Sequence, residues 1–340
     1  MMFPTSSQRK HWTFCGETEL NRLRTETNRK YLEKHAKKFK NKDDGTSFLD
    51  LKEERILLRH YEYALKEFCA RFQDSGPHEN KVIGLPREVV GTAINYMKRF
   101  FLNKSVMDYH PKDIMLTCVY LSTKVEENHV SLRTFVSNIK GDPDKNADIV
   151  LCFELLLMKE LHYHMTIHNP FRALEGLIID VKTRCKAVQA MPTKDVEKLR
   201  KGAFDFIDRS LSTDACLIFA PSQIALAALL ASASEQKINL DSYVTETLLM
   251  SESQEHVHKV IEQVKRIRYM VKHIEPISKE DVRNIHKKLM KCRNQENNPE
   301  SEVYKRKMDE LLEEEEEYQS QKRAKIAEEE KLAEKNLVGL

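Results

Sequence analysis

The sequence predicts an all-α protein on three observations: few turn-forming residues, apolar residues at helical spacing, and an internal repeat of that helical pattern. The chain of 340 residues has nine glycines and ten prolines. That is roughly half of their combined share in globular proteins, where glycine is about 7% and proline about 5%. A β-sandwich, barrel or propeller needs a turn roughly every 8–12 residues, and this sequence does not supply those turns.

Length and charge indicate two domains with a charged segment at each end. Domains of about 100–200 residues are typical, and the hydrophobic share of 41% is enough for buried cores. The formal net charge of +3 is the small difference between 56 basic and 53 acidic residues. Residues 1–42 are mainly basic and residues 300–340 mainly acidic. We therefore expect a nearly neutral body between two polarised arms.

Neither a targeting segment nor a membrane span is expected. The first ten residues, MMFPTSSQRK, lack the apolar stretch of a secretory signal. The longest uncharged segment, residues 215–234, nominally reaches the length of a membrane span, which is about 20 apolar residues. Pro221 and several Ser and Gln residues interrupt this segment, so it predicts two shorter helices of a soluble protein.

Composition also predicts that the chain has no catalytic, cofactor-binding or metal site of its own. The seven cysteines are scattered without a CxxC pair, which indicates a reducing intracellular compartment. No two glycines are close enough for a phosphate-binding loop, and the kinase motifs are absent. His162, His164 and His168 do not supply the four ligands usual for structural zinc, so we interpret them as loop histidines. Any phosphoryl transfer must then belong to a partner.

The amino-terminal arm is predicted to form a basic helix that lies on another part of the protein. It holds the only tryptophan, Trp12. Its apolar residues Leu20, Leu23 and Tyr31 are too sparse to form a continuous stripe. We therefore expect the arm to add little to a hydrophobic core.

Two amphipathic helices are predicted next. Asp50 and Glu53 form a capping box at the start of the first, and Leu85-Pro86 precedes the second, since proline suits a first helical turn. The apolar residues of the first recur at helical spacing: Leu57, Tyr61, Leu65, Phe68 and Phe72. Those of the second are Ala93, Ile94, Met97, Phe100 and Phe101.

A central helix is predicted after Pro111. Residues 114–123, IMLTCVYLST, carry no charge on any face, which is typical of a helix at the centre of a bundle. A polar loop at residues 140–145 precedes another helix, whose apolar residues are Ile149, Phe153, Leu156, Leu157 and Leu161.

A second helical set extends over residues 193–276, and a last helix is capped by Ser278 with Asp281 three residues later. Beyond residue 300 the chain is densely charged, with a glutamate run at 313–317. We expect a solvated tail there, either disordered or helical.

An offset of 110 residues aligns two segments without a gap. Residues 93–123 lie over residues 203–233, with the identities Ala93/Ala203, Arg99/Arg209, Pro111/Pro221, Ile114/Ile224, Leu116/Leu226 and Ser122/Ser232. In both copies an amphipathic helix leads through a proline into an uncharged helix. We interpret this pattern as a tandem duplication of one helical domain.

The aligned residues of the two copies can also be compared with each other. Where the side chains differ in chemistry, one copy is expected to have a function that the other lacks. Lys124 corresponds to Ser234, Glu126 to Gln236 and Glu127 to Lys237. The charged cluster at residues 124–127 therefore belongs to the first copy alone.

Two motifs at this spacing resemble those of the cyclin box family: LSTKVEE at residues 121–127 and FELLLMKEL at residues 153–161. The resemblance covers about residues 50–275. The stretches SSQRKHWTF (6–14), NKSVMDYHP (103–111) and HNPFRALEGLIIDVKTR (168–184) are closely similar to the branch of the family that forms the CDK-activating kinase of transcription factor TFIIH.

The resemblance implies tandem five-helix cyclin folds, with flanking amino- and carboxy-terminal helices that pack on the first. The domain limits that we predict are a basic arm at 1–48, a first box at 49–168, a second box at 169–276, a carboxy-terminal helix at 277–299 and a charged tail at 300–340.

The resemblance also implies the binding residues, because Lys124 and Glu154 fall on the kinase-contact positions of the family. By composition alone both are ordinary surface charges, but the difference between the copies and the resemblance favour a binding role. Lysine offers three donors and glutamate two acceptor oxygens, and helical spacing places Met158 on the face of Glu154. The predicted kinase-binding set is Lys124, Glu154, Val125, Met158, Tyr163 and Met165.

A non-enzymatic cyclin subunit is therefore expected, which binds and activates a cyclin-dependent kinase in the nucleus. The partners implied are the catalytic subunit of CDK-activating kinase, a ring-finger assembly factor and the TFIIH core, with substrates in other kinases and the polymerase carboxy-terminal repeat. No cofactor, membrane contact or sequence-specific nucleic acid binding is expected.

Three alternatives remain at this point: a transcriptional cyclin of the C or K type, a TFIIB-like DNA-binding factor with tandem cyclin folds, and a helical scaffold without a kinase. The TFIIB-like class requires a basic second repeat, whereas residues 185–275 mix both signs.

Overall fold

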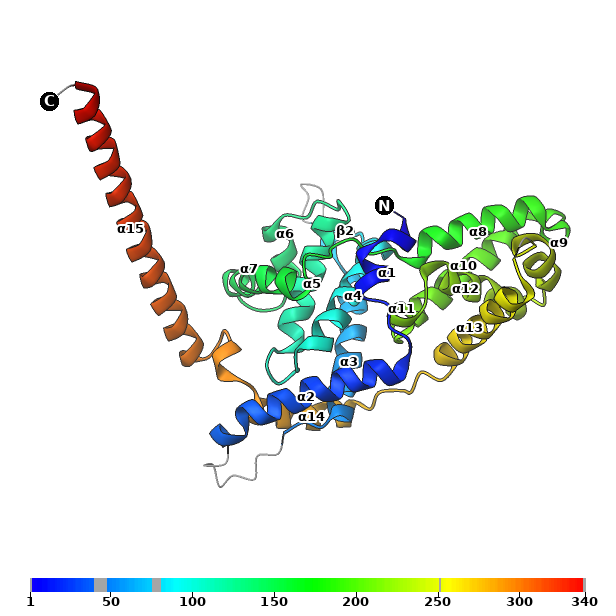
Figure 1. Ribbon diagram of the computed structural model, residues 1–340. Helices are drawn as coiled ribbons and strands as arrows, with labels where there is room; N and C mark the ends of the chain where they lie inside the picture. Colours follow the sequence, from blue (N-terminus) through cyan, green and yellow to red (C-terminus); the bar gives the residue numbers. More distant parts are fainter. Residues whose placement is uncertain (1, 40–47, 75–80, 251, 339–340) are drawn as a thin grey trace. The chain divides into compact units, whose positions relative to one another are not determined.

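The computed structural model describes residues 2–39, 48–74, 81–250 and 252–338. Nearly all secondary structure in these residues is helical, as the sequence predicts (Figure 1). The chain divides into two compact units, residues 1–292 and residues 293–340, which are described separately.

The first box contains five helices, of which the third is the central one. They are α3 (Leu51–Ala70), α4 (Arg87–Asn103), α5 (Pro111–Val125), α6 (Leu132–Ser137) and α7 (Pro143–Glu160). The central helix α5 packs against α3, α4 and α7, and its residues from Ile114 to Thr123 are all buried. The capping box of Asp50 and Glu53 is formed at the start of α3. The two-residue strands β1 (Gln73–Asp74) and β2 (Lys81–Val82) pair between α3 and α4.

The second box repeats this arrangement. Its helices are α8 (Pro170–Arg184), α10 (Thr193–Ser210), α12 (Pro221–Glu235), a π-helical turn η2 (Tyr243–Leu248) and α13 (Gln254–Lys272), with the short α9 (Lys186–Gln189) and α11 (Ala215–Ile218) between them. The central helix is α12, which packs against α8, α10 and α13. Pro221 divides the long uncharged segment into α11 and α12, as predicted, and no helix of the described residues is long and apolar enough to cross a membrane.

The structure confirms the internal repeat. Helices α5 and α12 begin and end at positions 110 residues apart. The turns that follow them also agree, because Glu127 and Lys237 both adopt left-handed backbone, with φ of 56° and 58°. In each turn the next amide donates to a carbonyl five residues back, from Asn128 to Thr123 at 2.8 Å and from Ile238 to Ala233 at 2.9 Å. The same local hydrogen bonds therefore end both central helices.

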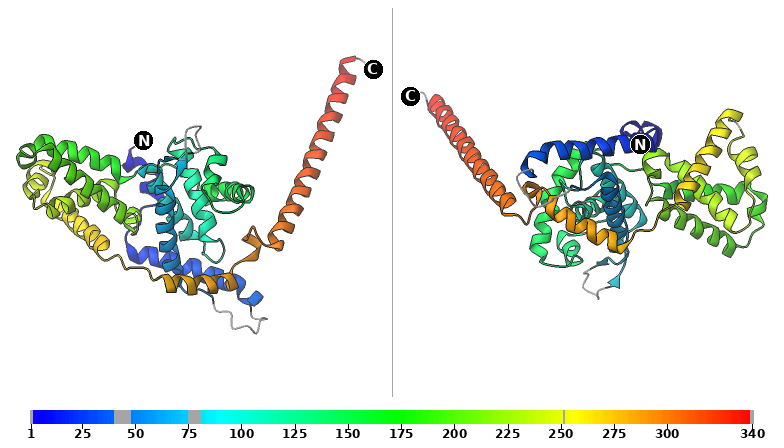
Figure 2. Two further views of the ribbon diagram at one scale, coloured as in Figure 1. Left: turned by 180° about the vertical axis from the view of Figure 1, so that it is seen from behind. Right: turned by 90° about the horizontal axis from the view of Figure 1, so that it is seen from below.

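The terminal helices of the first unit pack on the first box. The amino-terminal arm forms η1 (Phe3–Thr5), α1 (Ser7–His11) and α2 (Glu17–Phe39), and α14 (Lys279–Cys292) follows the second box. Helix α2 contacts α3 and α4, and α14 contacts α3, which both views of Figure 2 show. On α14, Lys288 Nζ lies 2.6 Å from Glu53 Oε2 and His286 contacts the Tyr61 hydroxyl at 3.2 Å.

The expectation that the amino-terminal arm adds little core is wrong. Trp12, Leu20 and Tyr31 are 4%, 0% and 5% exposed, respectively. Leu20 and Tyr31 join the main hydrophobic cluster. Although these side chains are few, each lies on the face that meets the box. The sequence shows how many apolar residues the arm has but not that three of them, Trp12, Leu20 and Tyr31, are buried.

The second unit consists of η3 (Gln295–Asn297) and α15 (Glu302–Val338). The charged tail was expected to be either disordered or helical, and the structure shows a helix. The described side chains of α15 are almost all exposed, which agrees with the expectation of a solvated segment.

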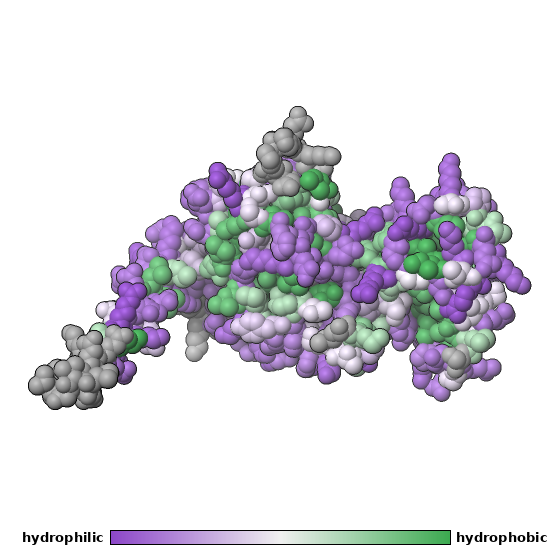
Figure 3. Space-filling model, turned by 90° about the horizontal axis from the view of Figure 1, so that it is seen from above, coloured by the Kyte–Doolittle hydropathy of each residue, from purple (hydrophilic) through white to green (hydrophobic). Residues whose placement is uncertain are grey.

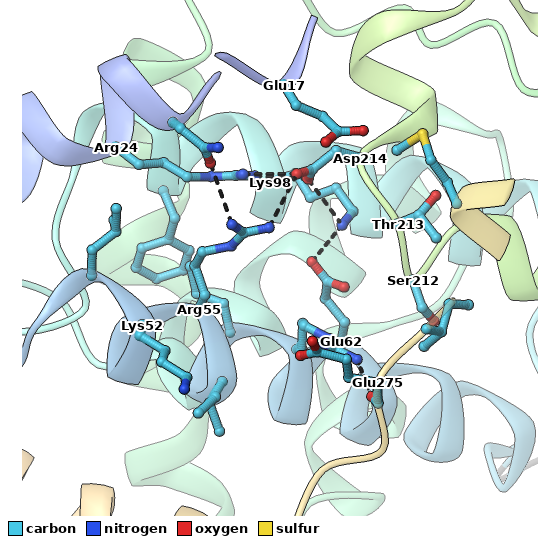
Figure 4. Close-up of a pocket in the computed structure, with 18 of the residues that line it drawn as sticks. Glu17, Arg24, Lys52, Arg55, Glu62, Lys98, Ser212, Thr213, Asp214 and Glu275 are labelled. Atoms are coloured by element: carbon cyan, nitrogen blue, oxygen red, sulfur yellow. Dashed lines mark hydrogen bonds and ion pairs between the residues drawn. The ribbon is translucent and has the colours of Figure 1, made fainter. Parts of the chain in front are cut away.

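A largely buried carboxylate, that of Asp214, joins the arm and both boxes. It lies just before α11 in the second box and accepts hydrogen bonds from both terminal nitrogens of Arg24 on α2, each at 2.7 Å. From the first box, Arg55 and Lys98 approach it at 3.8 and 4.0 Å, and Lys98 also pairs with Glu62 at 2.7 Å. Figure 4 shows these side chains converging beside a cavity of about 620 Å³.

Burial alone would raise the pKa of the Asp214 carboxyl. The hydrogen bonds and charge of Arg24, together with the charges of Lys98 and Arg55, outweigh burial and hold this pKa well below its usual range. Asp214 is therefore ionised at neutral pH and stabilises the contact between the boxes.

We expect Asp214→Asn to lower the free energy of unfolding by about 3 kcal/mol, because it leaves Arg24 without its anion, while Lys98 keeps Glu62 as its partner. Since the folded pKa is lowered, this contribution is present above the unfolded pKa of about 3.9 and is lost as pH falls below it. Urea unfolding at pH 7 and pH 3 measures both effects. Asp195→Asn, which removes an exposed pair with Lys198, is the matched control and should change stability by less than about 1 kcal/mol. Equal losses in the two variants would contradict the role of Asp214.

Candidate protein interface

The predicted residues Lys124 and Glu154 form a surface ion pair. Helices α5 and α7 pack side by side, which brings the Lys124 ammonium to 2.5 Å from Glu154 Oε1. The lysine side chain is 45% exposed and that of Glu154 is 16% exposed. The Lys124 ammonium also lies 4.5 Å from the centroid of the Tyr120 ring. Its place in the last turn of α5 is favourable, because the carboxy-terminal end of a helix attracts cations.

Three of the other predicted residues are only partly accessible. Val125, Met158 and Met165 are half-buried and pack against the hydrophobic core. Val125 follows Lys124, and Met158 lies one turn after Glu154, so both adjoin the ion pair along their helices. Met165 is held further along the chain, where its carbonyl oxygen accepts a hydrogen bond from the Tyr96 hydroxyl at 2.5 Å.

Tyr163 is presented by a strained turn at the end of α7. Its side chain is 61% exposed. His162 and Tyr163 both adopt left-handed backbone, with φ of 52° and 57°, which costs a non-glycine residue roughly 1–2 kcal/mol. Such strain persists where the surrounding structure holds it, and it is common at functional sites.

Sequence reasoning missed two further residues of this surface. Leu151 and Leu155 on α7 are 48% and 63% exposed, and they lie four residues apart, on one face of the helix. The signal was present in FELLLMKEL, because a helix with Phe153 and Leu157 on its buried face must turn Leu155 away from the core. Figure 3 shows hydrophobic side chains gathered among hydrophilic ones on one face of the molecule.

The second box lacks this arrangement. Ser234, which corresponds to Lys124, donates its hydroxyl to the Leu230 carbonyl of its own helix at 2.8 Å. Arg268 lies 3.4 Å from the same hydroxyl, so no acid–base pair forms there. The repeat therefore keeps its helices in both copies, whereas the exposed ion pair belongs to the first.

No metal centre is found among the residues that the structure describes, in which no group of three His, Cys, Asp or Glu side chains converges. His162, His164 and His168 do lie in the segment that connects the boxes, as predicted. His164 is not a solvated loop residue, because its Nδ1 accepts a hydrogen bond from the Trp12 indole at 3.0 Å.

Two homologous helical boxes, one of which carries an exposed ion pair beside exposed leucines, define a tandem-repeat binding protein. The amino-terminal cyclin domain model matches residues 80–166 and the carboxy-terminal cyclin domain model matches residues 169–272. The chain belongs to the cyclin family.

Similar proteins define the branch. Cyclin-H of Xenopus laevis is 39% identical over 298 residues, which are 87% of this chain and 88% of that protein. Cyclin-H1-1 of Arabidopsis thaliana is 34% identical, over 72% of this chain and 68% of that protein. A chain in the structure of the CAK complex from Chaetomium thermophilum, bound to ATP-γ-S, has the same fold, with a TM-score of 0.74, 23% identity and coverage of 92% and 94%. The resemblance inferred from the motifs is thereby confirmed.

The exposure of Leu155 has a measurable consequence for stability. We expect Leu155→Ala to change the free energy of unfolding by about 0.5 kcal/mol or less, as surface substitutions do. Leu157→Ala on the same helix removes a side chain that is 0% exposed, and it should cost about 2–5 kcal/mol. Urea unfolding of the two variants tests this difference, and a large loss at Leu155 would show that this leucine is part of the core.

Proposed function

We propose that this chain is the regulatory cyclin subunit of a CDK-activating kinase, which binds a cyclin-dependent kinase and activates it. The observation that carries the proposal is the Lys124–Glu154 pair, exposed beside Leu151 and Leu155 in the first box and without a counterpart in the second. Membership of the cyclin family supports it, and so do relatives that are named cyclin-H. The predicted domain limits and the predicted kinase-binding residues are part of this proposal.

The interface combines polar anchors with an apolar surround. An ammonium group has three donors and a carboxylate two acceptor oxygens, so the pair can hold together and still bond to the backbone of a partner. The exposed leucines would exclude water from these bonds when a partner covers them, which is how a few residues come to dominate binding energy. Because the two side chains already pair at 2.5 Å, the free subunit holds its anchors in one orientation.

Activation follows from differential affinity. An isolated cyclin-dependent kinase rests with its C-helix turned outward, and the cyclin binds the state in which that helix is turned inward. Binding therefore shifts the kinase population toward the inward state. The Lys–Glu ion pair of the kinase can then close and align ATP and magnesium. In this scheme the chain supplies no catalytic group.

The remaining partners complete the proposal. A ring-finger assembly factor and the TFIIH core would bind the cyclin–kinase pair, in the nucleus. The substrates would be activation loops of other kinases and the carboxy-terminal repeat of RNA polymerase. A cyclin of the C or K type is less consistent with relatives named cyclin-H that match most of the chain.

The double variant Lys124→Ala/Glu154→Ala tests the binding site. Kinase stimulation should fall at least about 30-fold, because anchor side chains contribute about 2 kcal/mol or more to binding. Thermal stability should hardly change, since half-exposed ion pairs contribute about 1 kcal/mol or less. The measurements are phosphorylation of a substrate peptide by the purified catalytic subunit, and circular dichroism on heating.

Ser234→Ala is the matched control, because Ser234 occupies the position of Lys124 in the second box and should leave stimulation unchanged. Full stimulation by the double variant would disprove the site. A loss at Ser234 as large as that at Lys124 would disprove the assignment of binding to the first box.

A further inference from the structure

Trp12, the only tryptophan of the chain, is buried against the segment that joins the two boxes. Its side chain is 4% exposed, and its indole Nε1 donates to His164 Nδ1 at 3.0 Å. The neighbouring His11 ring stacks on the His164 ring with centroids 4.7 Å apart. The arm therefore contacts this segment through side chains as well as through its helices.

Arg99 on α4 lies beneath the indole. It is 0% exposed, its guanidinium lies 5.0 Å from the Trp12 ring centroid, and Nη1 donates to the His164 carbonyl at 3.4 Å. Its Nε and Nη2 atoms have no hydrogen-bond partner among the described residues. Arg209, its counterpart in the second box, is 55% exposed and pairs with Glu235 at 3.9 Å. Burial of the arginine is thus particular to the box that Trp12 covers.

The same contacts hold the strained turn that presents Tyr163. The Tyr163 amide donates to the Met158 carbonyl at 2.9 Å, and His164 is fixed by Trp12 and Arg99 on the other side. In the second box His273 follows α13 directly, as Leu161 follows α7, and the two have similar φ, −102° and −80°. Among the described residues after His273, none adopts the left-handed backbone of His162 and Tyr163. The left-handed turn is therefore not a property of the repeat but of the copy that Trp12 holds.

Two further hydrogen bonds anchor the arm on either side of Trp12. The His168 amide donates to Gln8 Oε1 at 2.6 Å, and the Phe14 amide donates to the Leu217 carbonyl at 2.8 Å. The first bond joins the arm to the connecting segment and the second joins it to α11. Hydrogen bonds made by residues before and after Trp12 in the sequence thus hold it in place.

We propose that Trp12 is a positioning residue for the kinase interface: its indole N–H, bonded to neutral His164, holds the turn at residues 162–163 in the conformation that presents Tyr163. This inference rests on the proposed function. According to this inference the arm shapes the binding surface without having to touch the kinase itself.

The bond from Trp12 makes the turn sensitive to pH, because His164 Nδ1 accepts a hydrogen bond from the indole N–H only while it is itself unprotonated. The groups that face His164 are His11 on α1, His162 in the turn and Arg99 on α4. Burial, followed by the charges of His11, His162 and Arg99, lowers the pKa of His164. Since the folded pKa is lowered, the stabilisation is present above the unfolded pKa of about 6.5 and is lost as pH falls below it.

The test compares Trp12→Phe and His164→Asn in the full-length chain. Trp12→Phe keeps a ring over Arg99 but loses the N–H, so kinase binding should weaken about three- to tenfold, as expected for one lost hydrogen bond. His164→Asn keeps an acceptor in place of Nδ1 but does not titrate. The ratio of its affinity to that of the wild type should rise as pH falls from 7.5 to 5.5.

Tyr31→Phe is the matched control, because it also removes one hydrogen bond of the arm, from the Tyr31 hydroxyl to the Cys292 carbonyl at 2.8 Å. It should lower the free energy of unfolding like Trp12→Phe, yet leave kinase binding unchanged. Wild-type binding by Trp12→Phe, or equal weakening by Tyr31→Phe, would overturn the inference.

Intrinsic fluorescence tests the bond without a kinase, because Trp12 is the only tryptophan. The wild type should show a fluorescence transition below about pH 6.5. The transition should be smaller in His164→Asn, which keeps the His162 ring stacked on the indole at 6.0 Å. A transition of the same midpoint and amplitude in both proteins would overturn the inference. Failure of the wild type to stimulate any kinase would instead disprove the proposed function, so the two failures are distinguishable.

Discussion

The ion pairs of the Asp214 carboxylate are the interaction on which the rest of the structure depends. It brings together Arg24 of the arm, Arg55 and Lys98 of the first box, and a loop of the second. Burying a charge is costly unless it is paired, and here one anion meets three cations from other elements. The position of the arm, and with it that of Trp12, therefore depends on how the two boxes are placed around Asp214.

The duplication separates two tasks that a single box would have to combine. Both copies keep an apolar central helix, and their turns share the same left-handed residue, at Glu127 and Lys237. Only the first copy adds the exposed pair of Lys124 and Glu154. The second copy supplies Asp214 and so contributes to the stability of the pair of boxes. The proposed binding surface of the first copy and the stabilising role of the second can then change independently. A surface substitution in one copy leaves the other copy intact.

Much of the fold could be predicted, and so could six of the eight residues of the interface that we propose. Pro111 and Pro221 marked the starts of the central helices, and the Lys124/Ser234 difference indicated which copy carries the exposed ion pair. Leu155 was missed, because a run of apolar residues does not say which of them face solvent. The burial of Trp12 was missed for a related reason. A few apolar residues in a basic arm do not predict a buried contact unless the surface on which they pack is known.

The sequence by itself determined the helices, their caps, the repeat and the family. The helices and caps depend on residues within one or two turns of each other, so their period is visible along the chain. The repeat and the family are visible because such local patterns recur in order along the chain. Only the tertiary structure decided which charges are buried and how the turn at Tyr163 is held. The Trp12–His164 bond joins residues 152 apart and the Arg24–Asp214 bond joins residues 190 apart. No local pattern records such contacts, because they depend on how the packed helices place distant side chains.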